Sequence, residues 1–541
     1  MNRFMNLEPH QILTAVLAAA GPLSLLVLGM LPSGLLNRHG LRTARMAALN
    51  SLAGLAFACL ADVCLVCFGQ VDCKCAIAGP FGFGVYFDSL SAVMLTLVSF
   101  LLAVISRFSI NYLAGDLNQG RFTKWLCLTG GSVLMLAISG NLVQFALAWS
   151  ATSWFLHKLL VFYPERPGAV MAARKKFLIS RLGDVCLLAV LALVFNKFHS
   201  SEFSEIFAAS RRIHEAGFVQ DRFEINAICL LLAVGAMLKS AQFPFHSWLP
   251  DTMETPTPVS ALMHAGIINA GGFLVIRMNP LVTLSPAALS VLALFGAFTA
   301  LFASLVMLTH ASVKRSLAFS TVAQMGFMML ECGLGAFSLA VLHLVAHSLY
   351  KAHAFLSSGS IVRLAKSEWV PVEKPGAHPL TLVASFATAI VLSLGCAWVF
   401  SANWQHNSGL LVLAGAFSMA LAYALWNFWS RFINLPLAAF GVAFSGAIAS
   451  THFLLHKMFS GLLDAKDCVN SQANSPAGVL LLGALLALFL AVLVLQTELP
   501  QWANRPAFQA LYVHARNGFY FNTLANRAVA ALWPVKMAPK K

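Results

Sequence analysis

The residues of this chain that could do chemistry are titratable side chains set in apolar sequence. In LHLVAHSLYKAHAFL, His343, His347 and Lys351 follow one another at intervals of four residues. On a helix this spacing places them along one face, about 6 Å apart. Imidazole titrates near neutral pH and can accept a proton on one nitrogen while it donates from the other. The spacing therefore favours a proton relay, with His353 lying off the relay face.

A second candidate lies in the stretch AVGAMLKSAQFPFHSW, where Lys239 precedes Pro244 by five residues. Proline has no amide hydrogen and clashes with the carbonyl four residues earlier, so we expect the helix to break near Ser240. In a membrane such a break is tolerated where it is buried in protein or lines a hydrated cavity. The combination favours an ion path through Lys239. The alternative is that Lys239 extends its ammonium group to the membrane interface.

Two further charges lie in another apolar run, LISRLGDVCLL. Arg181 and Asp184 are three residues apart, which allows an ion pair on one helix. An ionisable side chain near the centre of a bilayer costs at least roughly 2.5 to 3.5 kcal/mol on insertion scales, so each needs a partner or a function. His264 is a further candidate, because it begins the apolar run that follows the expected break.

The elements that must position these residues are membrane helices. Of 541 residues, 59% are hydrophobic and 10% are charged, whereas soluble domains average about 25% charged residues. Repeated apolar runs of about 20 residues predict an all-α polytopic membrane protein with about 15 transmembrane helices, within a range of roughly 13 to 16. We divide it into N-terminal helices (1–85), a core (86–362) that holds the candidates, and C-terminal helices with a short basic tail (363–541).

Lysine and arginine in short loops predict the orientation. They follow the expected first, third, fifth and ninth spans, the fifth being followed by Arg166, Arg174, Lys175 and Lys176. The pattern predicts a multi-pass protein of the cell inner membrane, with its N-terminus periplasmic and its C-terminus cytoplasmic. The net charge of +15 is then mostly loop charge that faces anionic lipid, and no nucleic-acid partner is expected.

Several classes of chemistry are excluded by the inventory of motifs. The sequence has no GxxxxGK[ST] loop for nucleotide phosphates. It has no pair of CxxC motifs, so we expect no metal site within this chain. Carboxylates inside the apolar runs are too sparse for a hydrolytic pair. We therefore expect no catalytic residues, no cofactor in this chain, and a transporter or energy-coupling subunit rather than an enzyme.

The stretch KSAQFPFHSWLPDTMETPTPVSALMHAGIINAGG resembles the signature of the proton-translocating antiporter-like family. This family includes the large membrane subunits of respiratory complex I and of multisubunit sodium/proton antiporters. The resemblance continues in YFDSLSAVML, ARKKFLISRLGDVCLL and VKRSLAFSTVAQMGFMML, and covers about residues 86–361. It implies an inverted-repeat helix bundle in which the helix of Lys239 is broken. It also implies proton-path roles, which carry over to Lys239, Asp184, His264, Lys314, His343, His347 and Lys351.

The chain departs from the family pattern at three places. In ALAWSATSWFLHKLL, Ser150 occupies the position where pumping members carry a glutamate that pairs with the broken-helix lysine. No lysine occurs at positions 380–428, where a second broken helix should carry one, and the next candidates are Arg431 and the His456–Lys457 pair. We also expect no long lateral helix after HARNGFYFNTLANRAV. These departures argue against a respiratory complex I pump.

The motifs, the length and these losses together resemble the membrane subunits of DAB inorganic-carbon accumulation complexes. That resemblance implies a DabA-like zinc protein as partner on the cytoplasmic side, where zinc would hydrate carbon dioxide. The resemblance further implies that this chain couples a cation gradient, expected to be one of protons, to that hydration. Two alternatives stay open: a subunit of a cation/proton antiporter or complex I-like pump, and a non-conducting scaffold that anchors a soluble enzyme.

Overall fold

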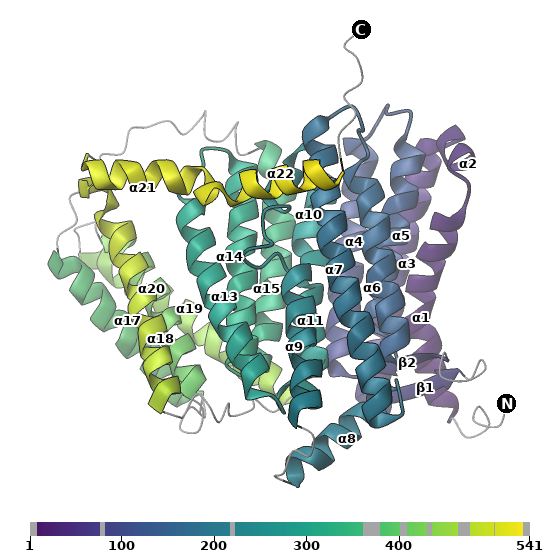
Figure 1. The fold of residues 1–541 in the computed structure, drawn as a ribbon, viewed down its shortest axis with the longest axis horizontal. Coiled ribbons are helices and arrows are strands. Elements are labelled where there is room, and N and C mark those ends of the chain that lie inside the picture. The colour runs from purple at the N-terminus through teal and green to yellow at the C-terminus, as the bar shows by residue number, and fades with distance from the viewer. Residues whose placement is uncertain are drawn as a thin grey trace.

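A computed structural model describes residues 8–75, 82–216, 222–360, 379–400, 408–429, 435–463, 476–502 and 504–533. Long helices stand side by side in an elongated bundle, with the N-terminal helices at one end and the C-terminal helices at the other (Figure 1). Eleven described helices are long and apolar enough to cross a membrane. They are α1 (Pro9–Met30), α3 (Gly40–Phe68), α4 (Ser89–Tyr112), α7 (Pro167–Phe198), the pair α10 (Thr257–Ala265) and α11 (Ala270–Arg277), α13 (Pro286–Met307), α15 (Phe337–Leu356), α17 (Pro379–Val399), α18 (Ser408–Trp429), α19 (Leu435–Leu462) and α20 (Pro476–Trp502).

Four more helices of 18 to 21 residues pack among these eleven. They are α5 (Gln119–Ala137), α6 (Leu142–Leu160), α9 (Arg222–Lys239) and α14 (Val313–Gly333). These helices carry more polar residues than the eleven, and they make extensive contacts with other helices of the bundle. With them, the prediction of an all-α membrane protein of about 15 spanning segments is confirmed.

The two strands and a surface helix lie on the face of the bundle where α1 begins (Figure 1). The strands β1 (Val71–Cys75) and β2 (Phe83–Phe87) pair antiparallel, with Val71 opposite Phe87. The surface helix α8 (Phe203–Glu215) lies on the same face (Figure 1). Lys74 of β1 forms an ion pair with Glu205 of α8 at 3.1 Å. The short helices α2 (Ser33–Arg38) and α12 (Asn279–Val282) complete the connections.

The expected helix break is confirmed. The helix α9 ends at Lys239, and Ala241 has a φ of 50°. Turns and a short 3-10 helix, Pro250–Glu254, lead to α10. The structure adds a second interruption that the sequence did not predict, between α10 and α11. There the side-chain amide of Asn269 donates to the carbonyl of Ala265 at 2.9 Å, so it satisfies an acceptor that the interruption exposes.

The two interruptions contact each other. The hydroxyl of Ser240, next to the break of α9, donates to the carbonyl of Ile268 at 2.7 Å. The helices approach so closely here that a Cβ added at Gly271 would lie 2.2 Å from the carbonyl oxygen of Ala236. A glycine is therefore required at position 271. The break at the end of α9 therefore packs against the break between α10 and α11.

The C-terminal segment corrects another expectation. Instead of a simple tail, the helices α21 (Pro506–Arg516) and α22 (Phe521–Leu532) lie across the bundle, on the face opposite to the start of α1 (Figure 1). The far end of this lateral segment docks on α7, where Arg174 donates to the carbonyl of Trp533 at 2.9 Å. Aromatic packing contributes to this docking, because Trp533 packs edge-on against Phe177 of α7 with ring centres 6.0 Å apart. The start of α22 packs on the turns after α9, where Phe521 lies edge-on against Phe243 with ring centres 4.6 Å apart.

Some sequence-based assignments change or fall outside the described residues. Lys175 and Lys176 were assigned to a loop, but they lie within α7 and are buried. Pro167 begins this helix, and a proline in the first turn needs no amide partner, so α7 starts earlier than the apolar run suggests. The boundary at 362–363 and Arg431 lie outside the described residues.

Candidate proton-transfer site

The site begins at Lys239, whose side chain is 6% exposed. Its ammonium group donates to the hydroxyl of Ser153 at 2.8 Å and to the carbonyl of Trp149 at 3.2 Å. It also lies 4.2 Å from the centre of the Trp149 ring, a cation–π contact. No carboxylate forms an ion pair with Lys239 in the described part of the chain. The structure therefore excludes the interface alternative for this lysine, and its direct partners are neutral groups.

Lys176 of α7 is a neighbour of Lys239 that sequence reasoning missed. Its ammonium group donates to the backbone carbonyl of Ser153 at 2.9 Å, so one serine joins both lysines. The nearby Asp184 forms the expected ion pair with Arg181 at 2.7 Å. Both of these charges act on Lys239 electrostatically. Lys239 is thus one of two buried lysines that share a serine, with the nearest acid engaged by arginine.

The relay face on α15 is confirmed as a geometric feature. His347 and Lys351 are buried, His343 is partly buried, and His353 is exposed on another face. The His343 and His347 rings lie 6.2 Å apart. Lys351 donates to the hydroxyl of Ser320 at 2.8 Å. Within the described residues neither ring nitrogen of His347 has a hydrogen-bond partner. A buried imidazole with both nitrogens free can take up and release a proton.

His264 lies elsewhere than sequence order suggested. Its Nδ1 is 3.1 Å from the hydroxyl of Thr321 on α14, and its ring stacks on Phe355 of α15 at 4.3 Å. Its electrostatic neighbours are Lys351 and His347. His264 therefore belongs to the α15 cluster rather than to the exit of α9. The break between α10 and α11 that follows His264 joins this cluster to the break at Lys239.

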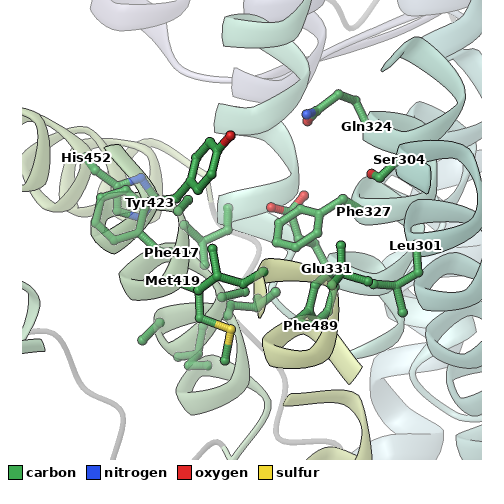
Figure 2. Close-up of a pocket in the computed structure, with 18 of the residues that line it drawn as sticks. Leu301, Ser304, Gln324, Phe327, Glu331, Phe417, Met419, Tyr423, His452 and Phe489 are labelled. Atoms are coloured by element: carbon green, nitrogen blue, oxygen red, sulfur yellow. The ribbon is translucent and has the colours of Figure 1, made fainter. Parts of the chain in front are cut away.

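Glu331 of α14 is the functional candidate that sequence reasoning missed most clearly. Its carboxylate lies 2.9 Å from Nδ1 of His343, and it is buried. The sequence did carry a signal for Glu331, because an acid inside an apolar run is rare. Helical spacing could not reveal its partner, since that residue lies 12 residues further along the chain, on the next helix. Glu331 also lines a cavity of about 480 Å³ that α18, α19 and α20 close on the other side. Figure 2 shows Glu331 among the aromatic side chains Phe327, Phe417 and Phe489.

Lys314 is the last of the predicted residues. It lies at the start of α14, is half-buried, and donates to the hydroxyl of Thr257 at 3.1 Å, at the first residue of α10. The structure thus places Lys314 at the edge of the bundle, whereas His264, His343, His347 and Lys351 form one interior cluster. Among the described residues, no three side chains of His, Cys, Asp or Glu converge in a way that could hold a metal ion.

Comparisons with known families cover this region. A family model described as NADH:quinone oxidoreductase/Mrp antiporter, TM, matches residues 139–371. A second model, described as NADH-ubiquinone oxidoreductase (complex I), chain 5 N-terminus, matches residues 78–123. Every residue of the candidate site lies within the first match.

Two curated relatives match most of the chain. One, from Halothiobacillus neapolitanus, is named a probable inorganic carbon transporter subunit, DabB2, and is 41% identical over 86% of this chain and 83% of its own length. The other, from Hydrogenovibrio crunogenus, is named a probable inorganic carbon transporter subunit, DabB, and is 35% identical over 84% of this chain and 85% of its own length.

A solved structure shares the fold. A chain of the Mrp complex from a Dietzia species matches 97% of this chain with a TM-score of 0.65 and 20% identity. This chain spans 60% of the length of that one. At this identity the likeness shows the fold alone, and it confirms the antiporter-like bundle that the sequence predicted.

Proposed function

This chain belongs to the family of DabB inorganic carbon transporter subunits, and we propose that it is the energy-coupling membrane subunit of a complex that accumulates inorganic carbon. It is a multi-pass membrane protein with an antiporter-like fold. In our proposal the coupling cation is the proton, and this chain couples the proton gradient to the hydration of carbon dioxide by a DabA-like zinc partner. The partner docks on the cytoplasmic side, and the membrane is the cell inner membrane, with the N-terminus periplasmic.

The observation that carries the proposal is the series of buried titratable groups between the break of α9 and the cavity beside α14. It starts at Lys239, continues in the His264, Lys351 and His347 cluster, and ends at the His343–Glu331 pair. Burying these groups is costly, so a function that uses them explains their presence better than packing does. His343 and His347, with ring centres 6.2 Å apart, are at a distance that one bridging water spans.

In the proposed path each of these residues has its own role in proton transfer. Lys239 holds and releases a proton against the neutral acceptors Ser153 and Trp149. His347 relays protons along α15, because it can take up a proton on one free ring nitrogen and release another from the second. The carboxylate of Glu331, 2.9 Å from Nδ1 of His343, places a negative charge at the end of the series. In this proposal the zinc is held by the partner, since no three His, Cys, Asp or Glu side chains converge among the described residues of this chain.

The test is to produce this chain together with its candidate partner in cells that need the complex to grow in air. We expect the two chains to copurify, zinc to be found at one site in the partner, and inorganic-carbon uptake to stop when an uncoupler removes the proton gradient. Uptake that persists with uncoupler would contradict proton coupling. A complex that exchanges sodium for protons without carbon uptake would favour the antiporter function instead.

A further inference from the structure

A second polar cavity lies where α21 passes over the rest of the molecule. Its volume is about 170 Å³. It is formed by three segments: the turns that follow α9, the connection between α13 and α14 with the first turns of α14, and the lateral segment of α21 and α22. The polar residues that matter here are His246 and Ser247 from the first segment, His310 and Arg315 from the second, and Arg516 and Thr523 from the third.

Two histidine nitrogens that line this cavity have no partner in the described part of the protein: Nδ1 of His246 and Nε2 of His310. His246 is 2% exposed. Its ring is held by packing on Phe302 with ring centres 5.1 Å apart, and His310 stacks on Phe319 at 5.0 Å. Packing therefore holds both rings, and buried nitrogens without a partner indicate a ligand that supplies one.

The charges lining the cavity that have no ion-pair partner among the described residues are positive. Arg315 and Arg516 both line it, and neither forms an ion pair within the described residues. The one carboxylate of the lining, Asp251, is engaged by an ion pair with Lys175 and by a hydrogen bond from Asn522 at 3.1 Å. Burial lowers the pKa of His310, and Arg315 and Arg516 lower it further. The free Nε2 of this ring lines the cavity together with the two arginines.

We propose that this cavity binds a small oxyanion between Arg315, Arg516 and the two histidines. Guanidinium groups present paired N–H donors that match the oxygens of such anions. The volume equals that of roughly six water molecules at about 30 Å³ each, which suits one bicarbonate or phosphate ion with some water. The same chemistry would recognise the phosphate of an anionic lipid headgroup, so the source of the oxyanion is decided by experiment.

The position of the cavity indicates what the anion does. His246 belongs to the segment that directly follows Lys239 and the break of α9, whereas Arg516 belongs to the lateral segment. A bound anion would bridge these two segments through its contacts with their charged and polar side chains. Its presence would thus favour one position of the turns that directly follow Lys239. This inference goes beyond the proposed function, because a proton path could operate with no anion site.

The test is calorimetric titration of the purified complex with sodium bicarbonate and, separately, with sodium phosphate, using sodium chloride as reference. We expect saturable binding of an oxyanion, weakened at least about tenfold in the variant that combines Arg315→Gln with Arg516→Gln, because two charge-assisted contacts are lost. The matched control is Arg527→Gln, since Arg527 is exposed on α22 and does not line the cavity. The single variant Arg516→Gln, at an exposed position, guards against misfolding of the double variant.

The lipid source is tested by native mass spectrometry after reconstitution in phosphatidylcholine with and without phosphatidylglycerol. Retention of phosphatidylglycerol by the unmodified complex, lost when Arg315 and Arg516 are replaced, would assign the cavity to a headgroup. Absence of both free-anion and lipid binding, or equal binding in the double variant, would overturn the proposal. Carbon uptake that continues in that case would leave the proposed function standing.

Discussion

The two ends of the buried polar series differ in where negative charge lies. At the α9 end, Lys239 has only neutral hydrogen-bond partners, and the nearest acid, Asp184, is engaged by Arg181. At the α14 end, His343 has the carboxylate of Glu331 at 2.9 Å. A cation beside neutral acceptors releases its proton more readily than one beside a carboxylate. The proposed path therefore has a carboxylate at its α14 end and none in direct contact with Lys239 at its α9 end.

The largest effect is expected at the end without an acid. Lys239→Ala removes the proton carrier, so carbon uptake should fall by about a hundredfold or more, the range of lost acid–base groups. Uptake of labelled bicarbonate by cells in air measures it, with copurification of the partner as the assembly check. The control Lys158→Ala changes an exposed lysine of α6 and should leave uptake unchanged. Normal uptake in Lys239→Ala with an intact complex would leave only the scaffold function.

The middle of the path is tested at His347. His347→Ala breaks the sequence of groups on α15, and we expect uptake to fall by about tenfold to a hundredfold. Dye-detected proton movement in vesicles should fall in parallel. His353→Ala, on the exposed face of the same helix, is the matched control. The relay assignment is wrong if both variants grow equally well in air and respond equally to uncouplers.

The acidic end is tested by Glu331→Gln, which keeps the shape of the side chain but removes its charge. The variant loses a charge-assisted hydrogen bond worth about 1.5 to 3 kcal/mol, so uptake should fall by roughly tenfold or more. Replacing the exposed Glu215 of α8 by Gln should have no effect. If Glu331→Gln transports at the normal rate, the two ends do not differ functionally and the path has another exit.

A smaller effect is expected for Ser153→Ala. This change removes the hydroxyl that accepts from Lys239 but leaves the carbonyl of Trp149 at 3.2 Å and the carbonyl of Ser153 for Lys176. One hydrogen bond is worth about 1 kcal/mol net, so uptake should change about fivefold. Ser150→Ala, at the position where the family has glutamate, should change it less. A larger loss in Ser150→Ala would identify Ser150 as the working partner of Lys239.

Much of the site could be predicted because it depends on features that are local in the chain. The break after Lys239 follows from Pro244, the shared face of His343, His347 and Lys351 follows from helical spacing, and the Arg181–Asp184 pair spans one helical turn. These relations need no knowledge of neighbouring helices. The structure reproduced each of them as geometry, whereas their roles in transport stay predictions.

What the sequence by itself determined is the class of protein and the identity of its buried titratable residues, because apolar composition and helical periodicity are properties of the chain. The tertiary structure alone decided their partners: Ser153 for both Lys239 and Lys176, Glu331 for His343, and the cluster around Lys351 for His264. It also decided that α21 and α22 lie across the bundle. Partners on different helices depend on how those helices pack, and in apolar surroundings small residues such as Gly271 set that packing through shape rather than through any repeat in the sequence.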